Sequence, residues 1–384
     1  MKGRISDIEI LRGIAVLMVV VHHANGNLFT WSSPALERFY TYFGGWFGVD
    51  LFFAISGFVI ARDLVPRLQS AQGYQAIKRT VLSFWLRRAW RLLPSAWLWL
   101  ALILLVTLLF NDSGIFGSLR TNLEATAAGI LQFANVRFAQ TFMNEPYGTS
   151  FVYWSLSLEE QFYLLFPLLI LLSRRYLPYV LIGLVLAQVF LVRSPMLMMF
   201  RTDALALGVL LALWSHHPSF AKLRPNLLAR SGAGLTLLLI SLLVMSLLAA
   251  DRLPGASIKV GLIAILSAVM VWVAAHNRDY LGVKGATGAL LRWLGGRSYG
   301  IYLIHIPAFF LIREIWFRMQ DGQPLDSSQF YPVLISAGLL IVLLCELNYR
   351  LVEKPFRLKG KHLADKLLIQ PVPLQNALNH EQST

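Results

Sequence analysis

The sequence contains few cysteines and few charged residues. Its one cysteine, Cys345, lies inside an apolar run, which excludes disulfides and cysteine-based metal clusters. Charged residues make up 14% of the 384 residues, whereas soluble domains contain about 25%. The chain also lacks an H-E-x-x-H motif, a Walker loop and a dinucleotide-binding glycine pattern. The low charge, together with a hydrophobic content of 57%, excludes a disordered chain, a coiled coil and a typical soluble enzyme. The missing cysteine and histidine motifs predict no metal site.

The sequence instead contains many long apolar runs. Hydrophobic residues make up 57% of the chain, and many runs have the length of about twenty residues that crosses a bilayer. The sequence therefore predicts an all-α integral membrane protein, a polytopic bundle of about ten transmembrane helices. The expected spans are 8–28, 43–62, 92–110, 153–173, 176–193, 200–216, 230–250, 257–276, 298–317 and 329–350.

Basic residues predict how the chain is oriented. Most of the 34 lysines and arginines fall in the segments that share one side of the membrane with the N-terminus. Basic loops are typical of the cytoplasmic side, so both termini are expected to be cytoplasmic. The same rule accounts for the net charge of +14, and we expect no nucleic-acid partner.

The pattern of polar residues divides the chain into two parts. Residues 1–357 are expected to form the transmembrane domain, and residues 358–384 a flexible cytoplasmic tail, because the tail is polar and of mixed charge. The basic, amphipathic stretch 62–90 is expected to lie on the inner membrane surface. A short helix is expected at 122–135, in the longest outer loop.

The first span carries an arginine and a histidine on one helix face. Arg12 and His23 are eleven residues apart, which is about 20° more than three full turns and about 16 Å along the axis. Charges at membrane depth are expensive, so each is a functional candidate. The alternative is an arginine that reaches the inner surface and a histidine that packs between helices.

The third span begins with a cluster of arginines. Arg88 and Arg91 are three residues apart and are therefore neighbours on a helix. Paired guanidinium groups can bind phosphates. The alternative is that these residues only mark the cytoplasmic boundary of the span.

Acidic residues gather at the outer ends of the spans. Asp50 lies near the outer end of the second span, and Glu159 and Glu160 lie near that of the fourth. The two glutamates point about 100° apart, so at most one is expected to face a given site. Arg201 and Asp203 begin the sixth span, where an ion pair that holds helices together is as good an explanation as a catalytic role.

The ninth span begins with a sequence that resembles a serine nucleophile motif. Residues 296–300 read G-R-S-Y-G, but that motif needs a strand-to-helix turn, so Ser298 is expected to cap a helix. Tyr302 and His305 follow within the span. His305 either lines a cavity or forms a hydrogen bond between helices.

The predicted topology sorts these residues into two layers. Arg12, Arg88 and Arg91 lie at the cytoplasmic face, and His23 lies with the acidic residues toward the outer face. The inner layer suits a phosphate-bearing cytosolic ligand, and the outer layer suits proton transfer on an extracytoplasmic substrate. An elongated donor would bridge the two.

Six motifs together resemble acyltransferase family 3, the bacterial membrane O-acyltransferases that modify envelope glycans. The resemblance extends from about residue 7 to residue 356. It rests on Arg12 and His23 with ten residues between them, on GVDLFFAISGF at 48–58, on RRAWR at 87–91 followed by Pro94, on WSLSLEEQFY at 154–163, on SYGIYLIH at 298–305 and on VEKPF at 352–356.

The resemblance implies a reaction and roles for individual residues. Acyl-coenzyme A, most commonly acetyl-coenzyme A, would be a cosubstrate in place of any tightly bound cofactor, and the acceptor would be a glycan hydroxyl such as one of lipopolysaccharide O-antigen or exopolysaccharide. Arg12, Arg88 and Arg91 would hold the donor phosphates. His23 would be the catalytic histidine, as a general base or as an acyl carrier. Asp50 or Glu159 would orient it. Glu160, Arg201, Tyr302 and His305 are further candidates.

The family also implies a location and partners. The protein is expected in the bacterial inner membrane, in contact with membrane lipid. Many members of the family continue into a soluble periplasmic domain that this sequence does not contain, so a separate periplasmic acyl-handling partner is expected where the acyl group is passed on. Two other readings of the residues stay open: a polytopic transporter or flippase for an envelope glycan precursor, and a structural subunit of a glycan-handling machine.

Overall fold

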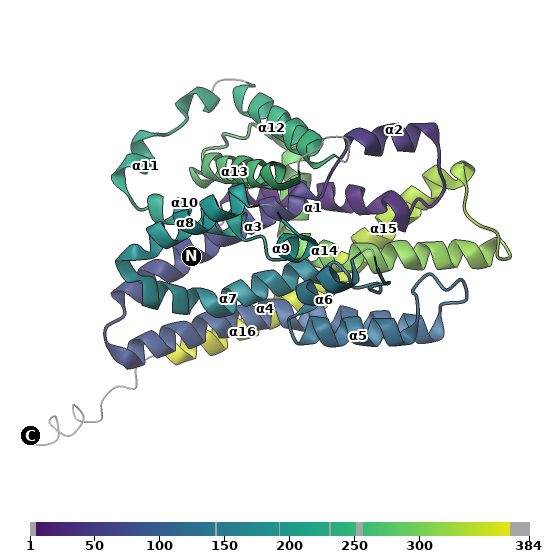
Figure 1. Ribbon diagram of the computed structural model, residues 1–384, viewed down its shortest axis with the longest axis horizontal. Helices are drawn as coiled ribbons and strands as arrows, with labels where there is room; N and C mark the ends of the chain where they lie inside the picture. The colour runs from purple at the N-terminus through teal and green to yellow at the C-terminus, as the bar shows by residue number, and fades with distance from the viewer. Residues whose placement is uncertain (1–4, 143, 192, 230–231, 251–255, 369–384) are drawn as a thin grey trace, which may run out of the picture.

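The computed structural model describes residues 5–142, 144–191, 193–229, 232–250 and 256–368. The described part of the chain is helical and contains no β-strand, as the sequence predicts. Most helices run along the long axis of the molecule (Figure 1). The α-helices are α1 (Ser6–Asn27), α2 (Pro34–Tyr42), α3 (Phe47–Ser70), α4 (Gly73–Leu109), α5 (Leu119–Ile130), α6 (Ala134–Thr141), α7 (Tyr153–Ser173), α8 (Leu177–Phe190), α9 (Pro195–Met199), α10 (Asp203–Trp214), α11 (Pro218–Lys222), α12 (Ala233–Ala249), α13 (Ala256–Ala275), α14 (Gly285–Met319), α15 (Phe330–Asn348) and α16 (Lys354–Leu368).

Seven helices or helix runs in the described residues are long and apolar enough to cross a membrane. The chain is therefore a multi-pass membrane protein by length and composition, while the count of about ten and the orientation of the termini stay predictions. The seven do not include α1, which carries three charged residues in its first two turns, or α12, which has 17 residues.

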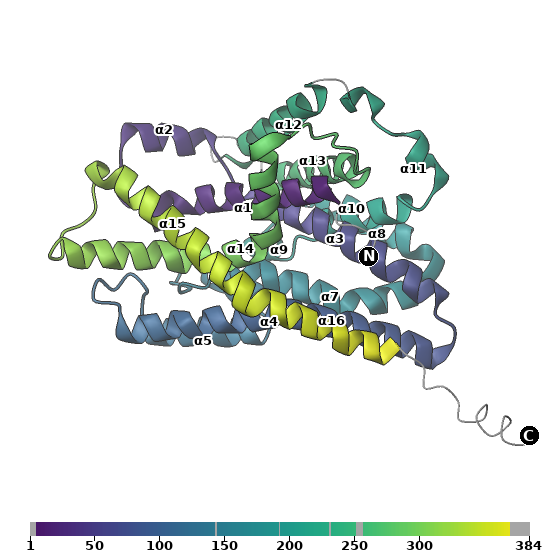
Figure 2. The same ribbon diagram turned by 180° about the vertical axis from the view of Figure 1, so that it is seen from behind.

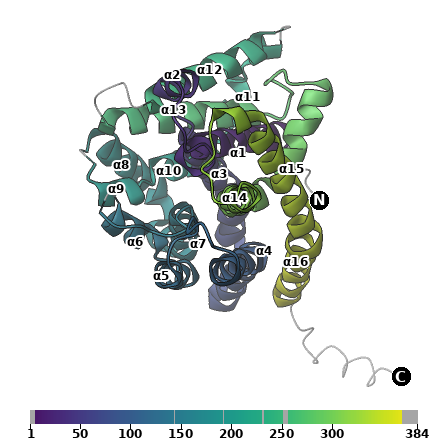
Figure 3. The same cartoon turned by 90° about the vertical axis from the view of Figure 1, so that its right-hand side faces the viewer.

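The centre of the bundle is formed by α1, α3 and α14 (Figure 3). α1 and α14 approach closely because glycines stand at their crossing. A Cβ atom on Gly13 would lie 2.2 Å from the Leu291 carbonyl oxygen, and one on Gly295 would lie 1.9 Å from that of Glu9. Small residues permit such close packing where lipid removes the hydrophobic drive between helices. This crossing places the Arg12 and His23 face of α1 against α14.

Two helices, α4 and α16, differ from the expectations for the stretch 62–90 and for the C-terminal tail. α4 is one continuous helix of 37 residues, so residues 73–90 extend the third span instead of lying on the membrane surface. α16 packs along α4 (Figure 2), where the rings of Trp90 and Phe356 stack with centres 5.7 Å apart. Residues 358–368, expected in the flexible tail, are therefore helical, and residues 369–384 lie outside the described residues.

Two helix boundaries also differ from the sequence predictions. α14 begins at Gly285, so Ser298 lies near its middle and does not cap it. The helix expected at 122–135 is two helices, α5 and α6, separated by Gln132, whose φ of 60° is left-handed. α6 packs against α7, which carries the two glutamates.

Candidate active site

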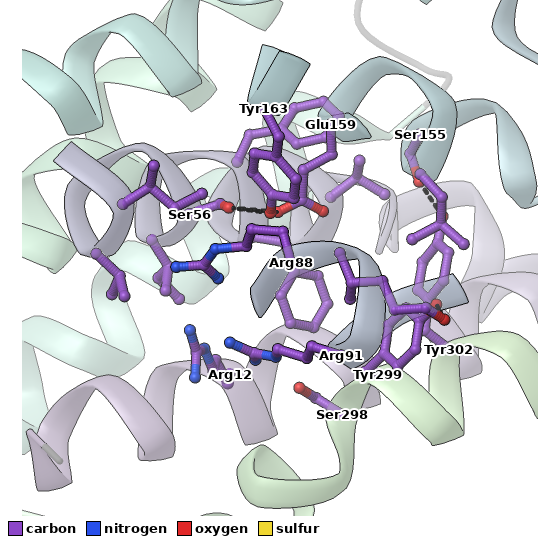
Figure 4. A pocket seen from close by; sticks show the side chains of 18 residues that line it. Arg12, Ser56, Arg88, Arg91, Ser155, Glu159, Tyr163, Ser298, Tyr299 and Tyr302 are labelled. Carbon is purple, nitrogen blue, oxygen red and sulfur yellow. Dashed lines mark hydrogen bonds between the residues drawn. The ribbon is translucent and has the colours of Figure 1, made fainter. Parts of the chain in front are cut away.

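A pocket lies between α1, α3, α4, α7 and α14 (Figure 4). It holds about 720 Å³ of space, part of it open to solvent. The side chains that line it with polar or charged groups include Arg12, Ser56, Arg88, Arg91, Glu159 and Tyr302. Residues from five helices that are far apart in the sequence therefore meet in one cavity.

One end of the pocket is rich in arginine (Figure 4). The three predicted donor-binding residues all line it, and Figure 4 shows the Arg12 and Arg91 side chains pointing toward one another. Arg12 pairs with Glu9 at 3.1 Å. The Nε atom of Arg91 is buried and has no hydrogen-bond partner among the described residues. This end of the pocket can therefore bind an anion such as a phosphate.

Arg88 is held against aromatic rings. Its guanidinium carbon lies 5.7 Å from the ring centre of Phe84 and 5.6 Å from that of Tyr163. These cation–π contacts fix the side chain. They leave the polar edge of the guanidinium group available to the cavity.

Glu159 is the glutamate that faces the pocket. Its Oε1 atom accepts hydrogen bonds from the hydroxyl groups of Ser56 and Tyr163, whose oxygen atoms are 2.7 Å apart. Glu160 is not among the residues that line the pocket. The difference of about 100° in direction accounts for this, as the sequence predicts.

His23 forms a pair with His305 across the α1–α14 interface. The Nδ1 atom of His23 lies 2.8 Å from the Nε2 atom of His305. The interhelical hydrogen bond predicted as one role of His305 is therefore present. Tyr302 connects the pair to the pocket, because its ring lines the cavity and its centre lies 5.8 Å from that of His305. Its hydroxyl group is 2.6 Å from that of Ser155.

The sequence predicts that an acidic residue contacts His23, but Asp50 and Asp203 bind arginines. Asp50 accepts two hydrogen bonds from Arg201, at 2.9 and 3.2 Å, and both side chains are buried. An ion pair between Asp203 and Arg201, one of the two explanations for these residues, is not formed, and Asp203 binds Arg193 at 2.5 Å. The guanidinium group of Arg201 also lies 4.8 Å from the ring centre of Trp154.

Each of the two carboxylates predicted to orient His23 forms hydrogen bonds with other side chains. Asp50 is occupied by Arg201, and Glu159 by Ser56 and Tyr163. The His23 ring forms its hydrogen bond with His305.

Sequence reasoning missed part of the pocket. Ser56 and Tyr163 occur in the recognised motifs, but no role was assigned to them. Tyr163 follows Glu159 by four residues, which is the helix spacing that brings two side chains together. Ser56 could be found only from the structure, because its partner lies 103 positions away. Among the described residues, no three histidine, cysteine, aspartate or glutamate side chains form a metal-binding group.

The fold and the pocket define a class: a membrane-embedded helical bundle that holds a cationic cavity beside a partly buried histidine pair. The sequence profile of the family described as "Acyltransferase domain" matches residues 5–347. The chain therefore belongs to this family, acyltransferase family 3.

Three relatives are similar over most of this chain. Peptidoglycan O-acetyltransferase OatA of Listeria monocytogenes is 29% identical, covering 93% of this chain and 56% of that protein. O-acetyltransferase OatA of Staphylococcus aureus is 29% identical, with 91% and 57% covered. YrhL of Bacillus subtilis is 28% identical, with 93% and 55% covered. The chain thus spans a little over half the length of the curated relatives it matches. No solved structure matches it.

Proposed function

We propose that the protein is a membrane O-acetyltransferase that moves an acetyl group from cytosolic acetyl-coenzyme A to a hydroxyl group of an envelope polysaccharide. The observation that carries the proposal is the pocket itself. Three arginines line it, and Tyr302 connects it to His23 and His305. A phosphate-bearing donor in the cavity would thereby lie beside a proton acceptor.

The dimensions along α1 suit an elongated donor. Arg12 and His23 are about 16 Å apart along the helix axis. The phosphates of coenzyme A would bind Arg12, Arg88 and Arg91, and its long arm would carry the thioester toward His23. Three positive side chains against the one carboxylate of Glu159 favour a polyanion in this cavity.

The reaction needs one base. The oxygen of the acceptor hydroxyl attacks the thioester carbonyl carbon while its proton moves to the imidazole of His23. The carbon–sulfur bond then breaks, and the thiolate of coenzyme A leaves and takes that proton. A route in which His23 first carries the acetyl group gives the same products in two steps.

The acceptor is proposed from the relatives. The Listeria relative is named a peptidoglycan O-acetyltransferase, so peptidoglycan is the first acceptor to test, and lipopolysaccharide O-antigen and exopolysaccharide follow. Because the acceptor would lie outside the cytoplasm and the donor inside it, the protein would span the inner membrane. A separate periplasmic partner would pass the acetyl group on where the membrane domain does not reach the acceptor.

The first test measures release of coenzyme A. The protein is purified in detergent and given acetyl-labelled acetyl-coenzyme A with peptidoglycan fragments. His23→Ala is expected to lower the rate of coenzyme A release by about 10²- to 10⁴-fold, the range for loss of a general base. His362→Ala, at an exposed site on α16, is the matched control.

Three outcomes separate the explanations. Label that stays on the wild-type protein supports an acetyl-histidine intermediate. Equal rates in wild type and a folded His23→Ala variant contradict the proposal. Absence of release with any acyl donor, together with glycan flux in vesicles, supports the transporter reading instead.

A further inference from the structure

The histidine pair contains one hydrogen bond whose direction is fixed by its surroundings. The two nitrogen atoms are 2.8 Å apart, the ring centres are 5.1 Å apart, and the ring planes differ by 10°. Parallel rings that stack face to face cannot bring two nitrogens to 2.8 Å. The bond therefore runs edge to edge, along the lone pair of one nitrogen and the N–H of the other.

The second nitrogen of His305 decides which ring donates. Its Nδ1 atom lies 3.2 Å from the backbone carbonyl oxygen of Ile301, one turn earlier in α14. A carbonyl oxygen only accepts, so His305 Nδ1 carries a hydrogen. In the neutral ring the other nitrogen, Nε2, then presents a lone pair. The bond to His23 must be donated by His23 Nδ1.

We propose that His305 is a positioning residue that holds His23 as its Nδ1–H tautomer and leaves His23 Nε2 as the reactive nitrogen. The catalytic part of this inference rests on the proposed function, and the tautomer does not. The orienting group is thus an uncharged imidazole where many hydrolases use a carboxylate.

The surroundings of His305 support this positioning role. The residue is fully buried, with 0% of its surface exposed. Tyr302 and Phe309 lie on either side along α14, with ring centres 5.8 and 6.0 Å from that of His305. Because both ring nitrogens of His305 have partners, the imidazole has one orientation. His23 Nε2 is directed away from His305, since the two nitrogens of an imidazole lie on opposite sides of the ring.

The tautomer can be read by nitrogen NMR of protein labelled with [¹⁵N]histidine in detergent. The His23 signals are identified as those that disappear in His23→Gln. In the wild type we expect a protonated Nδ1 and an unprotonated Nε2. His305→Leu should convert His23 to the Nε2–H form, and His305→Gln should keep the wild-type form, because its amide oxygen can accept from Nδ1. His362→Gln is the matched control.

Kinetics with acetyl-coenzyme A test the catalytic part. His305→Leu is expected to lower kcat about 10²-fold or more and leave the KM for the donor unchanged, as expected when a base has the wrong tautomer. His305→Gln should recover most of kcat. Loss of kcat in both variants with a lowered unfolding temperature would show a purely structural role and overturn the inference.

The outcomes for the inference and for the proposed function are distinct. A His23 tautomer that is Nε2–H in the wild type, or unchanged in His305→Leu, overturns the inference whatever the activity. The expected tautomer change in a protein that never releases coenzyme A supports the positioning role and overturns the proposed function.

Discussion

Arginines gather in two places inside the protein, and the two places differ in charge balance. In the pocket, Arg12, Arg88 and Arg91 face a cavity that Glu159 alone lines with a carboxylate. In the second cluster, each acid has its own arginine: Asp50 binds Arg201 and Asp203 binds Arg193, and both carboxylates are 0% exposed. The second cluster balances its own charge, whereas the pocket keeps an excess of positive charge.

This difference indicates which cluster binds a ligand. A charge away from water is stable only when something compensates it. The Asp50–Arg201 pair is compensated within the protein and joins α3 to the segment before α10. Arg12 has the compensating charge of Glu9, and the remaining positive charge of the pocket favours an anion in the cavity. Buried ionisable residues that look alike in the sequence therefore separate into a structural cluster and a binding site.

The largest effect on stability is expected from breaking the balanced cluster. Asp50→Asn leaves the Arg201 guanidinium buried without its negative partner. The free energy of unfolding should fall by about 3–5 kcal/mol. Unfolding in detergent, followed by tryptophan fluorescence against denaturant, measures this change, and the KM for acetyl-coenzyme A of the folded enzyme should stay as in the wild type.

Two variants sharpen that result. The double variant Asp50→Leu/Arg201→Met removes both charges and should recover much of the lost stability, because a buried pair can be replaced by apolar residues. Arg120→Gln breaks the exposed pair with Glu124 and should leave the unfolding transition unchanged. A rise in the KM for acetyl-coenzyme A in Asp50→Asn would show that the cluster of Asp50 and Arg201 also affects donor binding. The distinction between a structural cluster and a binding site would then be wrong.

A smaller effect, on binding, is expected in the pocket. Arg91→Gln removes one charged contact with the donor while the helix stays intact. Such a contact contributes about 1.5–3 kcal/mol, so the KM for acetyl-coenzyme A should rise about 10- to 100-fold with little change in kcat. Initial rates over a range of donor concentrations measure both constants.

The neighbouring arginine supplies the control. Arg87 lies on the same helix but is not among the residues that line the pocket, and it is 4.0 Å from Asp63. Arg87→Gln should leave the donor KM unchanged. An equal rise in both variants would mean that the basic surface attracts the donor in general, and that Arg91 has no specific contact with it.

Helix geometry explains what the sequence could predict. The eleven-residue spacing placed Arg12 and His23 on one face, and in the structure Arg12 lines the pocket while His23 contacts His305 of α14. The direction of successive side chains predicted that one glutamate faces the site, and Glu159 does. These arguments succeed because they use only positions within one helix.

Contacts between helices were beyond such arguments. The sequence offered Asp203 as one possible partner of Arg201, but the partner in the structure, Asp50, lies 151 positions away. Residues two apart do not face each other at a helix start, so each found a partner on another element. The same limit hid the bond between His23 and His305, which are 282 positions apart. Pairing across a bundle depends on which helices touch, and periodicity does not specify this.

The smallest effect is the change in stability with pH that is expected from Asp7, a buried acid close to a second acid, Asp279. Asp7 lies just before the first predicted span and is 1% exposed. Burial, together with the charge of Asp279, raises the pKa of the Asp7 carboxyl to about 6, although Arg292 acts in the opposite direction. In the unfolded chain the pKa is about 3.9. The folded protein therefore binds more protons between these values, and its stability falls as pH rises from about 4 to about 6.

Asp7→Asn should remove that decline. The variant is expected to match the wild type near pH 4 and to have the higher unfolding temperature above pH 6, where the wild-type carboxylate is ionised against Asp279. Asp279→Asn removes one of the two causes that raise the pKa of Asp7. In this variant the loss of stability with rising pH should therefore end at a lower pH than in the wild type. Unfolding temperatures in detergent at intervals between pH 4 and pH 8 test both variants. If Asp7→Asn lowers the unfolding temperature at pH 7, Asp7 has a stabilising partner, and this acid belongs with the balanced cluster of Asp50 and Arg201.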